Sequence, residues 1–203
     1  MSQYRDNLPQ MDGGLFVTDG GIETALVYLE GIDLPHFASF DLLRDVSGKE
    51  VLHKQFAGYA AIAKSNRVGC ILETPTWRAS ADWGDKMGYS KEALHVINEE
   101  AIHMLKSVRD EFETKDSPVV VSGCLGPRGD GYIAGELMST DEAQKYHTPQ
   151  IAAFDDAGAD MVCGLTMTYV EEAIGITRAA QAHNIPVAMS FTVETDGLLP
   201  TGQ

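Results

Sequence analysis

The sequence lacks several features that mark whole classes of protein. Its 203 residues include only three cysteines, Cys70, Cys124 and Cys163, which stand singly and form no CxxC pair. This number and spacing predict neither a disulfide framework nor a local metal knuckle, and they fit a reducing compartment. No stretch approaches the ~18 consecutive apolar residues of a membrane helix, and residues 1–10 lack the order of a signal peptide. We therefore expect a soluble, cytoplasmic protein without a membrane partner.

Basic residues are also scarce. Fifteen lysines and arginines face thirty aspartates and glutamates, which gives a formal net charge of -15. Because this charge repels phosphate backbones, nucleic acid is not an expected partner. Hydrophobic residues make up 44% of the chain, which is enough for a globular domain with a core of its own.

What the sequence does contain is an alternation of strand-like and helix-like segments. The expected strands are residues 16–18, 68–74, 118–122, 160–165 and 186–192. Helical periodicity or capping patterns place helices at 22–30 and 48–66, after Ser90, after Ser139 and before His183. Two capping-box patterns, Ser139 with Glu142 and Thr168 with Glu171, support the last two helices. This order predicts a parallel α/β sheet with right-handed connections.

A (β/α)8 TIM-barrel type and an open doubly wound sheet both give this order of elements. The open sheet usually carries a GxGxxG motif after its first strand, and the sequence has none there. The barrel is therefore favoured. Because barrels have eight strands and ~250 residues, we expect a barrel truncated after about five strands. Residues 1–14 are expected to be an N-terminal tail, and residues 15–203 a partial β/α barrel domain.

Polar or glycine-rich corners follow the expected strands, where barrel enzymes place their active sites. Asp19, Gly20 and Gly21 follow the first strand, and the glycines would let backbone amides approach an anion. Glu73 ends an apolar strand and needs a partner there, either a substrate ammonium or its own loop, for example Arg78. The first corner can equally be a tight turn in which Asp19 is a cap.

Five motifs stand at or near these corners: DGG at 19–21, ETPTWRAS at 73–80, GCLGPRGDGY at 123–132, AGAD at 157–160 and SFTVETDGLLPTGQ at 190–203. In this order, from Leu15 to Gln203, they resemble the homocysteine S-methyltransferase family. DGG alone is a weak signal, but several such motifs in order at strand ends are specific.

The resemblance implies a barrel enzyme that transfers a methyl group from a small donor to the zinc-bound thiol of homocysteine. Zinc deprotonates a thiol whose pKa is otherwise near ~8.5. The resemblance also places Asp19, Gly20, Gly21 and Glu73 in the substrate site. Zinc is expected for the complete enzyme, whose ligands are three cysteines in GxNC-like and GGCCG-like motifs. Neither motif occurs here, so we expect no metal ligand and no catalytic residue in this chain, and no activity from it alone.

The sequence departs from the family pattern at the fourth strand. Leu165-Thr166 stands where the family has a Glu-Thr-like element whose glutamate helps to hold the substrate amino group. Leucine cannot accept a hydrogen bond, so the acceptor is not fixed as homocysteine, and Glu171 and Glu172 come too late to replace the missing carboxylate.

Three further expectations concern single residue types. Arg128 and Asp130 are expected to brace each other across a turn rather than to guide a charged donor. The cysteines are expected to be small buried thiols rather than metal ligands, with Cys70 on the face opposite Glu73 and Cys163 pointing inward. The six histidines form no metal-binding pair and are expected on the surface or in packing roles.

Two other functions remain open. The chain can be a non-catalytic half-barrel that binds an amino acid, or one that a partner completes, with self-association through open sheet edges. It can also be a barrel enzyme of another kind, such as a lyase or a phosphate-sugar isomerase. The lyase or isomerase is not favoured, because no lysine ends a strand in a Schiff-base position.

Overall fold

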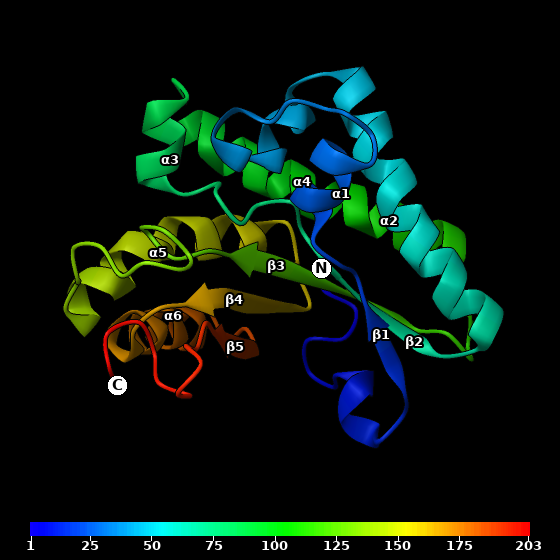
Figure 1. Cartoon of the computed structure of the whole chain (residues 1–203). Helices are drawn as coiled ribbons and strands as arrows, with labels where there is room; N and C mark the ends of the chain where they lie inside the picture. The colour runs from blue at the N-terminus through cyan, green and yellow to red at the C-terminus, as the bar shows by residue number, and fades with distance from the viewer.

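Five parallel strands form the centre of the computed structural model, which describes residues 1–203. The strands lie side by side in sequence order: β1 (Phe16–Thr18), β2 (Gly69–Glu73), β3 (Val119–Leu125), β4 (Met161–Met167) and β5 (Val187–Phe191). Every neighbouring pair is parallel. A sheet that grows by one strand at a time in one direction is part of a β/α barrel, and these five strands form a half-barrel (Figure 1).

Helices connect the strands and cover one face of the sheet (Figure 1). They are α1 (Ile22–Tyr28), α2 (Val46–Asn66), α3 (Ala81–Lys86), α4 (Lys91–Phe112), α5 (Thr140–Asp156) and α6 (Val170–Ala182). Three short 3-10 helices, η1 (Pro9–Asp12), η2 (Pro35–Phe37) and η3 (Ser39–Arg44), complete the set. The neighbours α2, α4, α5 and α6 pack against one another in that order. No helix has both the length and the apolar character needed to cross a membrane.

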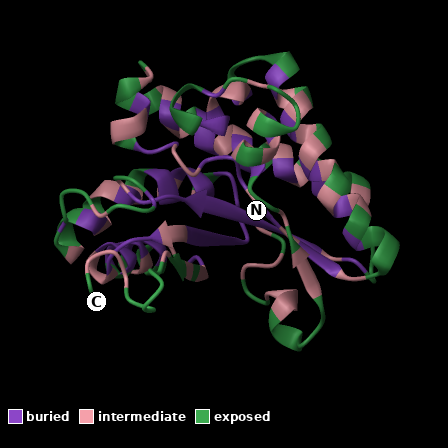
Figure 2. Ribbon diagram, in the orientation of Figure 1, coloured by how far each residue is buried: buried purple, intermediate pink, exposed green.

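The core lies between the sheet and this helical layer. Leu72, Val121 and Val162 point from the strands into a cluster that includes Leu52 and Phe56 of α2. Figure 2 shows that the central strand β3 is buried, that β1 at the edge is only partly buried, and that the outer surfaces of the helices are exposed. Because successive residues of a strand point to opposite faces, their neighbours point to the other side, which is the interior of a barrel. The functional residues considered below reach that side or the strand ends.

The predicted helices are confirmed, but one of the predicted N-terminal capping boxes is not. Ser90 caps α4, and Ser139 with Glu142 forms a complete capping box on α5. The predicted capping box of Thr168 and Glu171 is wrong, because β4 runs to Met167 and buries Thr168, so that α6 begins only at Val170. Oε1 of Gln203 instead accepts a hydrogen bond of 3.1 Å from the Val170 N–H.

The amino-terminal residues are anchored at the opposite end of the sheet from the corners. Oδ1 of Asp160 accepts hydrogen bonds of 2.8 and 2.9 Å from the backbone N–H groups of Gln3 and Tyr4. Its Oδ2 accepts from Arg109 and from the Val121 N–H, each at 2.9 Å. Asp160 directly precedes β4, so this fully buried carboxylate ties the amino ends of the strands together, where conserved stability features of barrels lie.

Candidate functional site

The first two corners of the sequence meet at the carboxyl ends of β1 and β2. Asp19 follows β1, and Glu73 is the last residue of β2, which pairs directly with β1. Oδ2 of Asp19 accepts a hydrogen bond of 2.9 Å from the backbone N–H of Glu73. The structure therefore brings together two residues that lie 54 positions apart in the sequence.

Gly20 and Gly21 continue from this pair into α1. Both are exposed, and Gly21 is the N-cap of the helix without any side-chain cap. A Cβ added to Gly20 would lie 3.1 Å from the Tyr59 hydroxyl, so the backbone here is close to α2 on one side and open on the other. The corner can therefore be approached by a ligand beside the Asp19 carboxylate.

Burial gives the carboxyl groups of this corner unusual acidities. It raises the pKa of Asp19 to about 7 and, together with the charge of Asp19, the pKa of Glu73 to about 8. Burial also raises the pKa of Glu23, although Ser39 donates a hydrogen bond of 2.6 Å to its Oε1. None of the three carboxyl groups forms an ion pair. Such a cluster is suited to a positively charged group, which would stabilise the ionised forms.

The side chain of Glu73 reaches the inner face of the sheet. Its Oε2 and the Oγ of neighbouring Ser122 are buried and form no hydrogen bond of regular geometry, although Ser122 and Cys163 lie close enough to Glu73 to oppose the rise of its pKa. Cys163 lies beside Glu73 on the same face, and Cys124 is the register partner of Cys163 on β3. A ligand that donates hydrogen bonds would satisfy these unpartnered oxygens.

The cysteines lie where the strand parity predicts. Cys70 packs into the helical core, on the face opposite Glu73, and burial raises its pKa to about 12. Burial also raises the pKa of Cys124 and of Cys163. The inner face thus has two thiols, and they do not form a group of three ligand atoms with Glu73. The residues present at this corner therefore do not fit a three-thiolate zinc site.

The alternative partner of Glu73, Arg78, lies elsewhere. Its guanidinium donates a hydrogen bond of 2.8 Å to the carbonyl of His36, and it stacks 3.9 Å above the ring of Trp83. The hypothesis of a Glu73–Arg78 ion pair is therefore wrong. The intervening loop turns Arg78 toward α3, which a reading of the sequence along a single strand could not show.

The expected brace between Arg128 and Asp130 is also wrong. Nε of Arg128 donates to Oδ2 of Asp82 at 2.7 Å, while Oδ1 of Asp130 accepts from the N–H groups of Tyr132 and Ile133 at 2.8 and 3.1 Å. A salt bridge to a residue 46 positions away has no local sequence signal.

The loop after β3 is instead held by a buried pair, Glu172 and His147. Oε1 of Glu172 accepts a hydrogen bond of 2.7 Å from the backbone N–H of Arg128 and lies 2.9 Å from Nε2 of His147. The His147 side chain is 0% exposed and that of Glu172 is 1% exposed. His147 thus has the packing role expected of the histidines, whereas no local pattern indicated that Glu172 supports this loop.

Trp77 is the main contact residue that the sequence did not single out. Its Nε1 donates to Oγ1 of Thr166 at 3.1 Å and lies 3.4 Å from the carbonyl of Leu165. A Cβ added to Gly131 would come within 2.7 Å of the Trp77 ring. Thr166 has a φ of 57°, and the pairing of β4 with β5 is irregular between Gly164 and Met167. Trp77 therefore joins three strand ends at an irregular point of the sheet.

Comparison with known proteins agrees with this arrangement. The family model described as homocysteine S-methyltransferase matches residues 16–203, whereas no curated protein matches the chain. Three crystal structures of the homocysteine methyltransferase MmuM from Escherichia coli are similar. The metallated form has a TM-score of 0.79 at 16% identity, over 97% of this chain and 70% of that one. The oxidized form has 0.80 at 19%, over 98% and 68%.

The apo form of the same enzyme has a TM-score of 0.70 at 17% identity, over 98% of this chain and 68% of that one. At these identities the structural likeness establishes the fold, and the family model establishes the kinship. The chain belongs to the homocysteine S-methyltransferase family.

Proposed function

We propose that the chain provides the substrate-recognition side of a methyltransferase that moves a methyl group from a small donor to the thiol of an amino acid. Asp19 and Glu73 bind the amino group, and the backbone at Gly20 and Gly21 faces the carboxylate. The observation that carries this proposal is the contact between the Asp19 carboxylate and the end of β2, which gathers unpaired carboxyl groups at one corner.

The charge of the corner supports an ammonium ligand. A cation beside Asp19 and Glu73 lowers the pKa of both groups and replaces mutual repulsion by attraction. Leu165, which ends the inner row of β4 together with Cys163, has no atom that can accept a hydrogen bond. The amino group therefore depends on the carboxyl groups of β1 and β2.

Zinc in this family makes a bound thiol a nucleophilic thiolate at neutral pH. Cys124 and Cys163 do not form a three-ligand group with Glu73, so we propose that the ligands of this metal lie outside the 203 residues. On this proposal the isolated chain binds substrate weakly and does not turn it over. Methyl transfer to homocysteine by the chain alone, with or without added zinc, would contradict it.

The binding proposal is tested by calorimetric titration of L-homocysteine and of 4-mercaptobutyrate, which has no amino group. We expect Glu73→Gln and Asp19→Asn each to weaken binding of homocysteine about tenfold or more, because each removes a charge-assisted contact. Neither variant should alter the weak binding of 4-mercaptobutyrate. Asp33→Asn, an exposed carboxylate after α1, is the matched control. Unchanged affinity in Glu73→Gln leaves only a structural role for this residue.

A second candidate function is a half-barrel that another chain completes. β1 and β5 are the edges of the sheet, and the inner face near β5 exposes Ala188 and Ser190. Phe191 and Val193 add exposed apolar surface at 40% and 57%. We propose self-association through these edges in a reducing, cytoplasmic setting that suits three free thiols. Sedimentation of the chain as a compact monomer would contradict it.

A further inference from the structure

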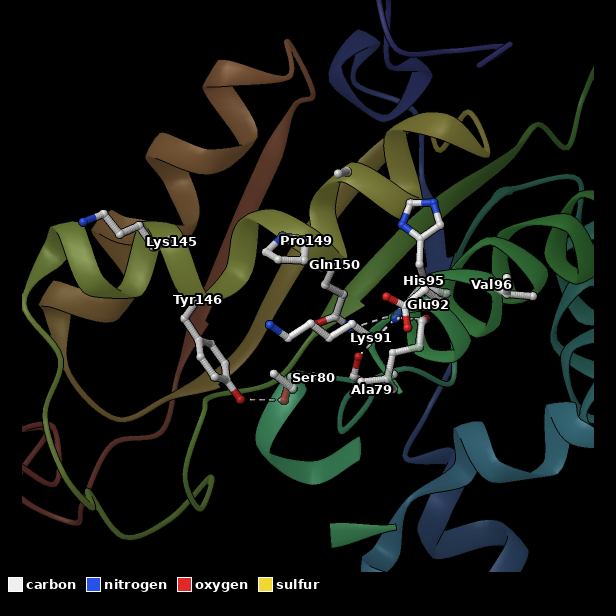
Figure 3. Close-up of a pocket in the computed structure, with 14 residues that line it drawn as sticks. Ala79, Ser80, Lys91, Glu92, His95, Val96, Lys145, Tyr146, Pro149 and Gln150 are labelled. Carbon is white, nitrogen blue, oxygen red and sulfur yellow. Dashed lines mark hydrogen bonds between the residues drawn. The ribbon is translucent and has the colours of Figure 1, made fainter. Parts of the chain in front are cut away.

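Three potential metal ligands meet on the outer surface, in the helical layer rather than at the strand ends. His95 and Glu99 lie one turn apart on α4, and Asp156 is the last residue of α5. One ligand atom from each lies within 4.8 Å of the other two, and this is the only such group in the chain. Figure 3 shows His95 on α4 where that helix passes α5.

The distances within this group fit a metal ion better than direct hydrogen bonds. Nε2 of His95 is 3.5 Å from Oδ2 of Asp156 and 3.7 Å from Oε1 of Glu99. Both distances exceed the usual range of an N–H···O hydrogen bond. Ligands bound tetrahedrally at about 2.0–2.2 Å from zinc are roughly 3.3–3.6 Å apart, so a small inward movement completes the geometry.

The electrostatic environment of Asp156 also favours a cation. Asp155 and Asp156 end α5, and the last turn of this helix contains no basic residue. Negative charge is unfavourable there, because the carboxyl end of a helix carries partial negative charge. Asp155 is compensated by Arg5 at 2.6 Å and by His183 at 3.0 Å. Asp156 has only His95 as a basic neighbour.

We propose that His95, Glu99 and Asp156 bind a divalent transition-metal ion, with zinc as the best match, that clamps α4 to α5. One imidazole and two carboxylates suit zinc, cobalt or nickel better than magnesium, which prefers oxygen ligands alone. The side chains of His95 and Asp156 are 39% and 62% exposed, so an ion can enter from solvent and water can complete its coordination. The site is distinct from the carboxyl groups and thiols of the inner face.

The clamp has a structural consequence for the loop after β2. His95 and Gln150 line a cavity of about 630 Å³ between α4 and α5 (Figure 3). Asn98 also lines this cavity. Asn98 donates to the carbonyl of Ala79 at 3.1 Å, and Gln150 to that of Thr76 at 3.0 Å. An ion that fixes the spacing of α4 and α5 therefore also fixes the side chains of Asn98 and Gln150, which hold the loop after β2 in place.

The test is titration of untagged, metal-free protein with zinc chloride, followed by calorimetry and by the thermal midpoint. Cobalt(II) serves as a second probe, because its visible spectrum reports ligand type and geometry. We expect one ion per chain and a raised midpoint, since the ion binds the folded state. His95→Ala should abolish both effects, and Asp156→Asn should weaken binding at least about tenfold. His103→Ala, an exposed histidine of the same helix, should change neither.

Three results would overturn the proposal. The first is the absence of zinc or cobalt binding by a folded protein, and the second is equal affinity in wild type and His95→Ala. The third is binding that survives His95→Ala but is lost in Cys124→Ser or Cys163→Ser, with a thiolate-type cobalt spectrum. Metal-free circular dichroism of each variant verifies that lost binding does not reflect unfolding.

Discussion

The carboxylate of Asp19 accepts a hydrogen bond of 2.9 Å from the backbone N–H of Glu73, so that a side chain extends the pairing of β1 and β2 beyond the last backbone hydrogen bond, which runs from the Asp19 N–H to the Ile71 carbonyl. The contact keeps two acidic residues in one buried corner. Burial opposes the ionisation of both, and in addition the charge of Glu23 opposes that of Asp19 and the charge of Asp19 opposes that of Glu73.

The stability of the protein should therefore fall as the pH rises from about 4 to about 8. The unfolded chain releases the protons of Asp19 and Glu73 near pH 4, whereas the folded protein retains them until about 7 and about 8. Folding is then penalised at higher pH, by several kcal/mol at pH 8.5 relative to pH 5, since each pH unit over which a group stays protonated only in the folded state costs about 1.4 kcal/mol. Urea denaturation of wild type and Glu73→Gln at both values measures this. The variant should gain relative stability at pH 8.5, and parallel curves would contradict the expectation.

The pair of Glu172 and His147 supports the loop after β3. Glu172→Ala leaves the Arg128 N–H and the imidazole buried without a partner, so we expect a loss of about 2–4 kcal/mol in the free energy of unfolding. Hydrogen exchange of the Arg128 amide should also become faster. Glu172→Gln keeps an acceptor oxygen and should cost less than Glu172→Ala. Equal exchange rates in wild type and Glu172→Ala would show that the loop is held by other contacts.

Asp160 should be among the most sensitive positions of the chain. Its carboxylate accepts from Gln3, Tyr4, Arg109 and Val121, and Asp160→Asn leaves a buried arginine without its counter-charge. We expect a loss of about 3–5 kcal/mol, measured by urea denaturation. Asp116→Asn, an exposed aspartate before β3, should change the stability by less than about 0.5 kcal/mol.

Removing the capping box of α5 should lower the stability of the protein by a smaller amount. Oγ of Ser139 accepts from the Glu142 N–H, and the Glu142 carboxylate accepts from the Ser139 N–H at 2.8 Å. Ser139→Ala should lower the thermal midpoint and cost about 1 kcal/mol. Ser65→Ala, an exposed serine near the end of α2, is the control, and a loss as large as that of Ser139→Ala would argue against a capping effect.

The order of strands and helices could be predicted from the sequence because it depends on local periodicity. The apolar rows of α2 and α4 and the short β3 run appear in the residues themselves. Strand parity also placed Cys70 and Glu73 on opposite faces, and the barrel rule brought Asp19 close to Glu73.

The contacts that the sequence did not reveal all join distant segments. Arg128, after β3, bonds Asp82 of α3, and Trp77, after β2, bonds Thr166 near the end of β4, because these segments converge at the carboxyl ends of the strands. Thr168 resembles a helix cap in sequence but is buried, because β4 runs to Met167, immediately before it. Local patterns cannot show where a strand ends when packing decides it.

The anchoring of Gln3 and Tyr4 has a consequence for the synthesis of the polypeptide. These residues leave the ribosome long before Asp160, their partner 156 or 157 positions later, has been synthesised. Gln3 and Tyr4 cannot make these contacts until Asp160, which directly precedes β4, is in place. Contacts of such long range form late in folding. Gln3 and Tyr4 therefore gain their final contacts only after the first three strands and α5 have been synthesised.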